Sequence, residues 1–128
     1  MKIRFKGNSI RIRIQQQELH ALSKTGQIED RVTFGVTDSQ QLGFCLRSGD
    51  EGSALSADFN GSNVLVLIPR DIVEEMVSTE RVGVEYDQEF DAGKSLRILV
   101  EKDFKCLSPR MEDVDAFPHP EEAQGHSC

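Results

Sequence analysis

The signals for strands, turns and helices repeat along this chain with an offset of 54 residues, and this repeat constrains the fold more than any other feature. Identical residues recur at this offset where strands, turns and helices end: Phe5 and Phe59, Gly7 and Gly61, Ile14 and Ile68, Thr25 and Thr79, Leu42 and Leu96. A length of 128 residues fits one domain. We therefore expect a duplicated ββαββ domain at residues 1–107, with its two units at residues 1–50 and 55–104.

Strict alternation of polar and apolar residues predicts a β-hairpin at the start of the first unit. Lys2–Lys6 and Ile10–Ile14 both alternate with a period of two, as strands with one buried face do. Gly7 and Asn8 between them favour a two-residue turn, because glycine adopts positive φ without steric cost and asparagine tolerates it. Such a turn fixes which residues lie opposite each other.

Four cations share the polar face of this predicted hairpin. The register places Arg4 opposite Arg11 and Lys2 opposite Arg13. Like charges directly opposite each other destabilise a sheet, so the four side chains need compensating negative charge. An anionic ligand is one source, because arginine holds a phosphate or carboxylate group with paired hydrogen bonds. Lys2, Arg4, Arg11 and Arg13 are therefore the candidate ligand-binding residues.

Neutralisation within the sheet is the alternative interpretation of this face. The candidate partners are carboxylates on the later strands: Glu85, Asp87 and Glu101. The second predicted hairpin does not repeat the cations, because Asp58 faces Leu65 there and Ser56 faces Leu67. The two units have therefore diverged at this surface.

The remaining elements follow the same order in both units. The first unit continues with a helix at Gln15–Thr25, which Gly26 ends, and with strands at Arg31–Val36 and Leu42–Arg47. The second has a strand at Asn63–Ile68, a helix starting after Pro69, and strands at Val82–Asp87 and Leu96–Lys102. We expect an α+β fold with two short helices on one side of a mostly antiparallel sandwich or partly closed barrel.

Charge and composition exclude several classes of protein. The net charge of −7 argues against a nucleic-acid binder, which needs a basic surface. Residues 1–50 hold eight basic and five acidic residues, whereas residues 51–128 hold seven and seventeen. No apolar run is long enough to span a membrane. Three widely spaced cysteines do not form a secreted disulfide framework, so we expect a cytoplasmic protein.

The C-terminal stretch differs from the rest of the chain. Residues 108–128 are acidic and broken by proline, so we expect an extended arm and tail there. The stretch from residue 106 onward contains possible zinc ligands: Cys106, His119, His126 and Cys128. Their spacing matches no zinc finger, and no nucleotide-binding or nucleophile motif is present. We therefore expect no metal and no cofactor.

Three stretches resemble a small bacterial protein family known only as a domain of unknown function. They are Lys6-Gly-Asn-Ser-Ile-Arg11, Leu96-Arg-Ile-Leu-Val-Glu-Lys-Asp-Phe-Lys-Cys-Leu107 and Asp115-Ala-Phe-Pro-His-Pro120. The resemblance implies a bacterial cytoplasmic protein of this length, but it transfers no activity and no site residue. It also implies that the Phe-Pro-His-Pro segment belongs to the domain.

Two shorter resemblances suggest alternative functions. A cationic barrel wall is similar to that of the triphosphate tunnel enzymes, although their Glu-x-Glu-x-Lys motif is replaced here by Lys2-x-Arg4-x-Lys6. The strand and helix around Ile68-Pro69 resemble the swapped-hairpin regulators, which bind DNA as intertwined dimers. The leading expectation is a non-enzymatic binding or protein-interaction domain, whose partner could be a second copy of the chain. The alternatives are an enzyme or sensor for a phosphorylated small ligand and a swapped-hairpin regulator.

Overall fold

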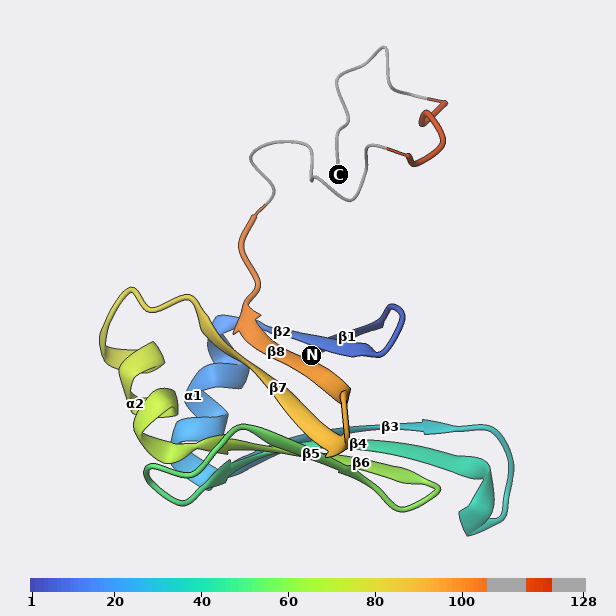
Figure 1. Ribbon diagram of the computed structural model, residues 1–128, viewed down its shortest axis with the longest axis horizontal. Helices are drawn as coiled ribbons and strands as arrows, with labels where there is room; N and C mark the ends of the chain where they lie inside the picture. The colour runs from blue at the N-terminus through green and yellow to red at the C-terminus, as the bar shows by residue number, and fades with distance from the viewer. Residues whose placement is uncertain (106–114, 121–128) are drawn as a thin grey trace.

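The computed structural model describes residues 1–105 and 115–120, and within them the element order ββαββ occurs twice (Figure 1). The first half contains β1 (Lys2–Phe5), β2 (Ser9–Ile14), α1 (Gln16–Thr25), β3 (Gln27–Thr33), the 3-10 turn η1 (Asp38–Gln40) and β4 (Gln41–Gly49). The second contains β5 (Ser56–Phe59), β6 (Asn63–Pro69), α2 (Arg70–Ser78), β7 (Gly83–Asp91) and β8 (Lys94–Lys102). The predicted α+β class and its two short helices are confirmed.

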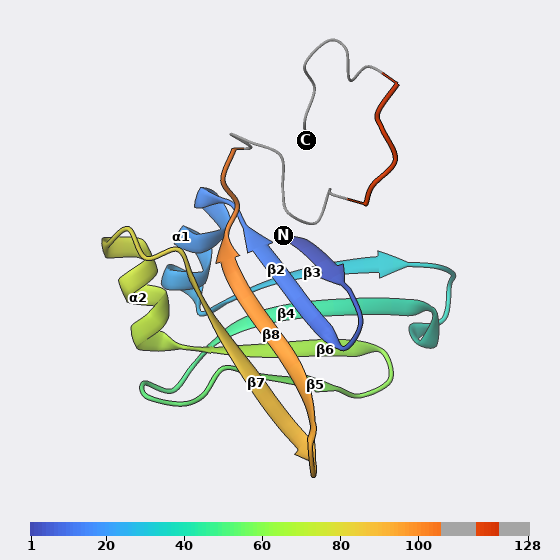
Figure 2. The ribbon, with the colours of Figure 1, turned by 45° about the horizontal axis from the view of Figure 1, so that its top comes forward.

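The strands form two four-stranded sheets that face each other as a sandwich (Figures 1 and 2). Sheet A has the order β1-β2-β8-β7 and sheet B has the order β3-β4-β6-β5. Each sheet therefore combines one hairpin from each half of the chain. The hairpins are antiparallel, whereas the central pairs β2–β8 and β4–β6 are parallel. The mostly antiparallel sandwich is confirmed, and the sheets do not close into the barrel that was the other expectation.

An approximate two-fold symmetry relates the two halves. In the parallel pair of sheet A, Ile10 lies beside Ile98. The residue 54 positions after Ile10 is Val64, and the residue 54 positions before Ile98 is Phe44. Phe44 and Val64 likewise lie beside each other in sheet B. The hairpins agree too, because Phe5 faces Ile10 and Phe59 faces Val64. The register of strand pairing thus repeats together with the order of elements.

Several predicted strand boundaries are wrong. β4 ends at Gly49 instead of Arg47, and β8 begins at Lys94 instead of Leu96. β3 spans Gln27–Thr33 instead of Arg31–Val36. Gly26 ends α1 with a left-handed φ of 87° and turns the chain straight into the strand, where its carbonyl accepts a hydrogen bond from Ser48 N–H at 2.8 Å. β7 continues to Asp91 because the β7–β8 hairpin closes with a tight turn at its end.

The core lies between the sheets at the end that the helices cover. The apolar sides of both sheets and one stripe of each helix supply its fully buried residues: Ile14, Leu22, Leu46, Val66, Ile68, Val73, Met76, Ile98 and Val100. α1 and α2 lie side by side at this end (Figures 1 and 2). β2 and β6 lead directly into these helices, so the hairpin turns at their other ends lie far from the covered core.

Different contacts join the two sheets at their two open edges. On one edge the Gln88 amide exchanges two hydrogen bonds of 2.9 Å with the backbone of Ala57, which links β7 to β5. On the other, the Met1 ammonium donates to Glu18 and, at 3.1 Å, to Asp30. Desolvation lowers the pKa of this ammonium, but the two carboxylates outweigh that effect and the pKa is raised above 8.0. These seams hold the sheets in the sandwich arrangement.

No helix among the described residues is long and apolar enough to cross a membrane. Most of the predicted arm at residues 108–128 lies outside the described residues, as do Cys106, His126 and Cys128.

Candidate functional site

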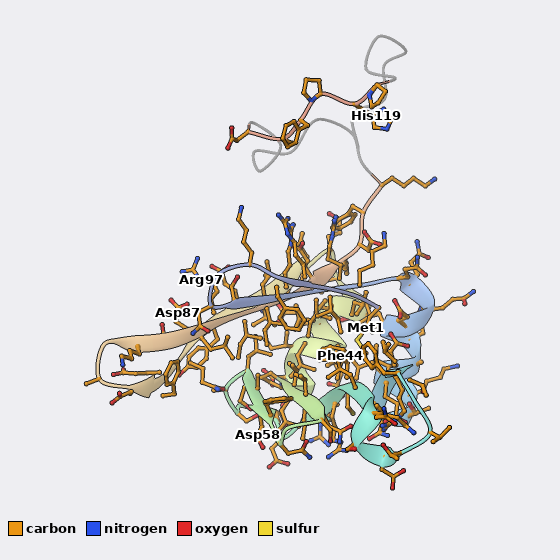
Figure 3. All side chains as sticks on the ribbon, turned by 90° about the vertical axis from the view of Figure 1, so that its right-hand side faces the viewer. Met1, Phe44, Asp58, Asp87, Arg97 and His119 are labelled. Atoms are coloured by element: carbon orange, nitrogen blue, oxygen red, sulfur yellow. The ribbon has the colours of Figure 1, made fainter. Side chains whose placement is uncertain are left out.

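An apolar cleft opens between the two sheets at the end opposite the helices. Its volume is about 430 Å³. The turn of the first hairpin and the apolar sides of both sheets line it: Phe5, Gly7, Asn8, Ser9, Ile10, Leu42, Phe44, Ala57, Asp58, Phe59, Val64 and Leu96. Figure 3 looks into this end and shows Phe44 between the sheets. Asp58 is the one charged residue among the lining residues, and the strand register places its side chain on the outward face of β5, opposite Leu65.

The lining of the cleft follows the symmetry of the chain. Three pairs of equivalent residues contribute to it: Phe5 with Phe59, Ile10 with Val64, and Leu42 with Leu96. The Phe5 and Phe44 rings lie 6.0 Å apart between their centroids, so an aromatic pair forms part of the wall. Phe5 and Phe59 remain 58% and 62% exposed, because the sheets splay apart here and no helix covers them. The cleft is therefore open to a ligand.

The four predicted cations lie on the face of sheet A that points away from the cleft. The register is the predicted one, with Lys2 opposite Arg13 and Arg4 opposite Arg11. The alternating isoleucines of β2 face the core, so the arginines between them face outward. The sandwich thus has no basic lumen, and the comparison with a triphosphate-tunnel wall fails on this geometry.

Two carboxylates, one on β8 and one just beyond it, pair with Lys2, Arg11 and Arg13. Glu101 Oε1 lies 2.6 Å from an Arg11 guanidinium nitrogen and 3.6 Å from Arg13 Nε. Asp103 lies 2.9 Å from Lys2 Nζ and 3.5 Å from an Arg13 nitrogen. The side chains of Glu101 and Asp103 are only 15% and 10% exposed. Internal neutralisation therefore accounts for much of the charge at the Lys2–Arg13 end of the face.

The other two predicted partners have different positions. Asp87 on β7 binds Arg97 of β8 with hydrogen bonds of 3.0 and 3.3 Å (Figure 3). The hydrogen bond from Arg97 holds the pKa of Asp87 below its usual 3.8 and raises the pKa of Arg97. Glu85 lies opposite Leu99 in the sheet. In the order of sheet A, β8 lies between β7, which carries both carboxylates, and β2.

Metal-binding side chains do not gather within the described residues, where no group of three or more His, Cys, Asp or Glu could hold an ion. His20 is exposed on α1, and Cys45 is a half-buried free thiol on β4. His119 is the only one of the four possible zinc ligands that the structure describes.

Residues 1–121 match the model of DUF7009, a family of unknown function. The chain belongs to this family. The expected membership of a family known only as a domain of unknown function is thereby confirmed. No curated protein matches the chain, and no solved structure matches the DUF7009 fold described here. The function of this DUF7009 chain therefore has to be argued from its own cleft and its own charged face.

Proposed function

We propose that the chain is a non-enzymatic binding domain that holds a mainly apolar small molecule in the cleft between its sheets. The main support for this proposal is the cleft itself, whose volume of about 430 Å³ lies within the range of small-molecule sites. Its walls are apolar and aromatic, as in most small-molecule sites.

Two features of the cleft favour binding over catalysis. Its lining residues include no histidine, cysteine or lysine. Its walls come from both sheets and are held by the hydrogen bonds between Ala57 and Gln88 and by those of the Met1 ammonium, which favours a pre-formed site.

We also propose a cytoplasmic, bacterial setting. The wide spacing of the three cysteines supports the cytoplasm, and the family resemblance supports a bacterial protein.

Titration with Nile red, a neutral fluorescent dye, tests this proposal. We expect saturable enhancement of dye fluorescence with a Kd on the order of 10 µM. Leu42→Trp and Leu96→Trp place a larger side chain in the cleft and should weaken binding at least about tenfold. Phe90→Ala is the matched control, because Phe90 is exposed and does not line the cleft.

Equal dye binding by the wild type and both tryptophan variants would overturn the proposal, as would the absence of saturable binding. Cooperative urea unfolding of each variant checks that the dye reports a folded protein and not a loosened core.

Self-association is a second candidate function, favoured by exposed aromatics near the ends of the two long hairpins. Phe34 follows β3 and is 73% exposed, and Phe90 on β7 is 62% exposed. Val36 beside the first of these is fully exposed. Large exposed apolar side chains of this kind are candidates for an interaction surface.

Sedimentation equilibrium of the wild type and the double variant Phe34→Glu/Phe90→Glu tests this candidate. We expect a wild-type dimer at micromolar concentration and a monomeric variant. A wild type that is monomeric at every concentration would remove self-association without touching the cleft proposal.

A further inference from the structure

Large apolar side chains remain exposed around the end of the sandwich where the cleft opens. The edge strands of both sheets, β1, β3, β5 and β7, all run toward this end (Figure 1). These strands, and the segment that follows β3, supply seven exposed apolar residues, which we call the rim: Phe5, Val32, Phe34, Val36, Phe59, Tyr86 and Phe90. The helices cover the other end of the sandwich, so they leave the rim in contact with water.

The rim continues the walls of the cleft and follows the symmetry of the chain. Three pairs of its residues are related by the 54-residue offset: Phe5 with Phe59, Val32 with Tyr86, and Val36 with Phe90. Val32 lies opposite Leu42, which lines the cleft. Tyr86 lies opposite Ile98, which in turn lies beside Ile10 of the cleft. The rim and the cleft therefore belong to one apolar surface that both halves of the chain build.

This surface is large enough for a stable protein interface. The five aromatic side chains of the rim are each between 46% and 73% exposed. An aromatic side chain has about 200 Å² of surface, so the five leave roughly 600 Å² open to water. Val32 and Val36 add to this area. An interface of standard size buries about 800 Å² on each partner, which the rim approaches.

A second copy of the chain is the partner that fits the rim. A dimer with two-fold symmetry uses the same surface on both copies, so each apolar rim would remove the other from water. Charge does not oppose this contact at the turn between β7 and β8, because Lys94 Nζ lies 3.8 Å from an Asp91 carboxylate oxygen and balances it.

We propose that two copies pack with these open ends against each other and that the contact closes the cleft of each copy. Phe5 and Phe59 belong to both the cleft lining and the rim, so a partner that covers them also covers the mouth of the cleft. A ligand in the closed cleft loses contact with water and gains contact with the second copy. Ligand binding and self-association therefore strengthen each other by the same factor. The closure rests on the proposed binding of an apolar ligand, and it makes the second copy part of that site.

Sedimentation equilibrium with and without saturating Nile red tests this linkage. We expect the dye to lower the Kd of the dimer at least about fivefold. The apparent Kd of the dye should fall to the same extent as the protein concentration rises through the Kd of the dimer.

Three variants locate the contact. Val32→Glu should weaken the dimer at least about tenfold, because it places a carboxylate without a partner in the interface. Val36→Glu should do the same, and Val36 is fully exposed, so this variant does not disturb the core. Val82→Glu is the matched control: Val82 is 49% exposed against 48% for Val32, but it precedes β7 at the end that the helices cover. It should change the Kd of the dimer less than about twofold.

Four results would overturn the proposal, and each identifies a different failure. A wild type that is monomeric at every concentration leaves the rim to a different protein and leaves the cleft proposal standing. A dimer whose Kd does not respond to the dye removes the closure but neither the cleft nor self-association. Equal weakening by Val32→Glu and Val82→Glu places the contact elsewhere on the chain. The absence of saturable dye binding removes the cleft proposal and the closure together.

Discussion

The hairpins β1–β2 and β5–β6 are equivalent by symmetry, yet only their inward faces agree. Ile12 and Ile14 in β2 correspond to Val66 and Ile68 in β6, and all four are buried. On the outward faces, Arg11 and Arg13 in β2 correspond to the half-buried Leu65 and Leu67 in β6. The backbone register is the same in both hairpins. The core therefore constrains the inward residues, whereas the outward face has been free to acquire different chemistry in each half.

The largest expected effect tests whether the inward faces are equivalent. Ile14 and Ile68 are 1% and 0% exposed at matching positions, directly before the two helices. We expect Ile14→Ala and Ile68→Ala each to lower the free energy of unfolding by about 2–5 kcal/mol, and by similar amounts. Urea unfolding measures both. If one variant costs less than half as much as the other, the two inward faces are not equivalent.

The second prediction concerns the outward face of the first hairpin alone. Glu101 is shared by Arg11 and Arg13, so Glu101→Gln removes a charged partner from two partly buried guanidinium groups at once. We expect a loss of about 1–3 kcal/mol in the free energy of unfolding, which partial exposure reduces from the buried-pair value. The matched control is Glu85→Gln on the exposed β7, with a change within about 0.5 kcal/mol. Equal stability of the two variants would show that Glu101 has no such role.

The third prediction is a smaller loss of stability, and it compares the turns of the two hairpins. Gly7 has φ of 58° and Gly61 has φ of 98°, and a Cβ at either position meets no atom within 4 Å. The cost of Gly→Ala is therefore one of backbone strain, about 1 kcal/mol. We expect Gly61→Ala to cost more than Gly7→Ala, because φ at Gly61 lies further from the left-handed region open to L-residues. Thermal unfolding should reveal the order, and a reversed order would contradict this explanation.

The smallest expected effect is a shift in titration at the edge of sheet A. The hydrogen bond from Arg97 keeps the pKa of Asp87 below its usual 3.8. A depressed carboxyl pKa means that the pair stabilises the fold above the ordinary pKa and loses this contribution as pH falls through the folded value. In Arg97→Gln the Asp87 pKa should return toward 3.8, as followed by the carboxyl carbon chemical shift. An unchanged pKa would show that another group lowers it.

Local sequence signals predicted the parts of the structure that neighbouring residues determine. The Gly7-Asn8 turn and the alternation beside it were enough to place Arg4 opposite Arg11, as observed. Glu101 was a predicted partner and is one. Asp103 was missed because it follows the last predicted strand, although its N–H extends the sheet by a hydrogen bond to Ile14 O at 2.8 Å.

Contacts between distant segments were beyond such signals. The parallel pairing of β2 with β8 joins residues 10 and 98, and no turn between them indicates it. Only the order of strands in the sheet shows that Asp87 pairs with Arg97 and not with a cation of the first hairpin. Alternation identified the apolar sides of the strands, but it carries no information on where two sheets splay apart. The cleft and the exposure of Phe5 and Phe59 therefore emerged only from the structure.

The exchange of hairpins between the sheets has a consequence for how the chain folds. Neither half contains a complete sheet, because each supplies one hairpin to sheet A and one to sheet B. Cut into two, the halves would have to find each other by diffusion, and their folding would depend on concentration. The connection between β4 and β5 supplies an effective concentration in the millimolar range instead, so one chain folds on its own. The same connection makes the whole domain a single cooperative unit with slow, non-local strand pairing as its natural rate-limiting step.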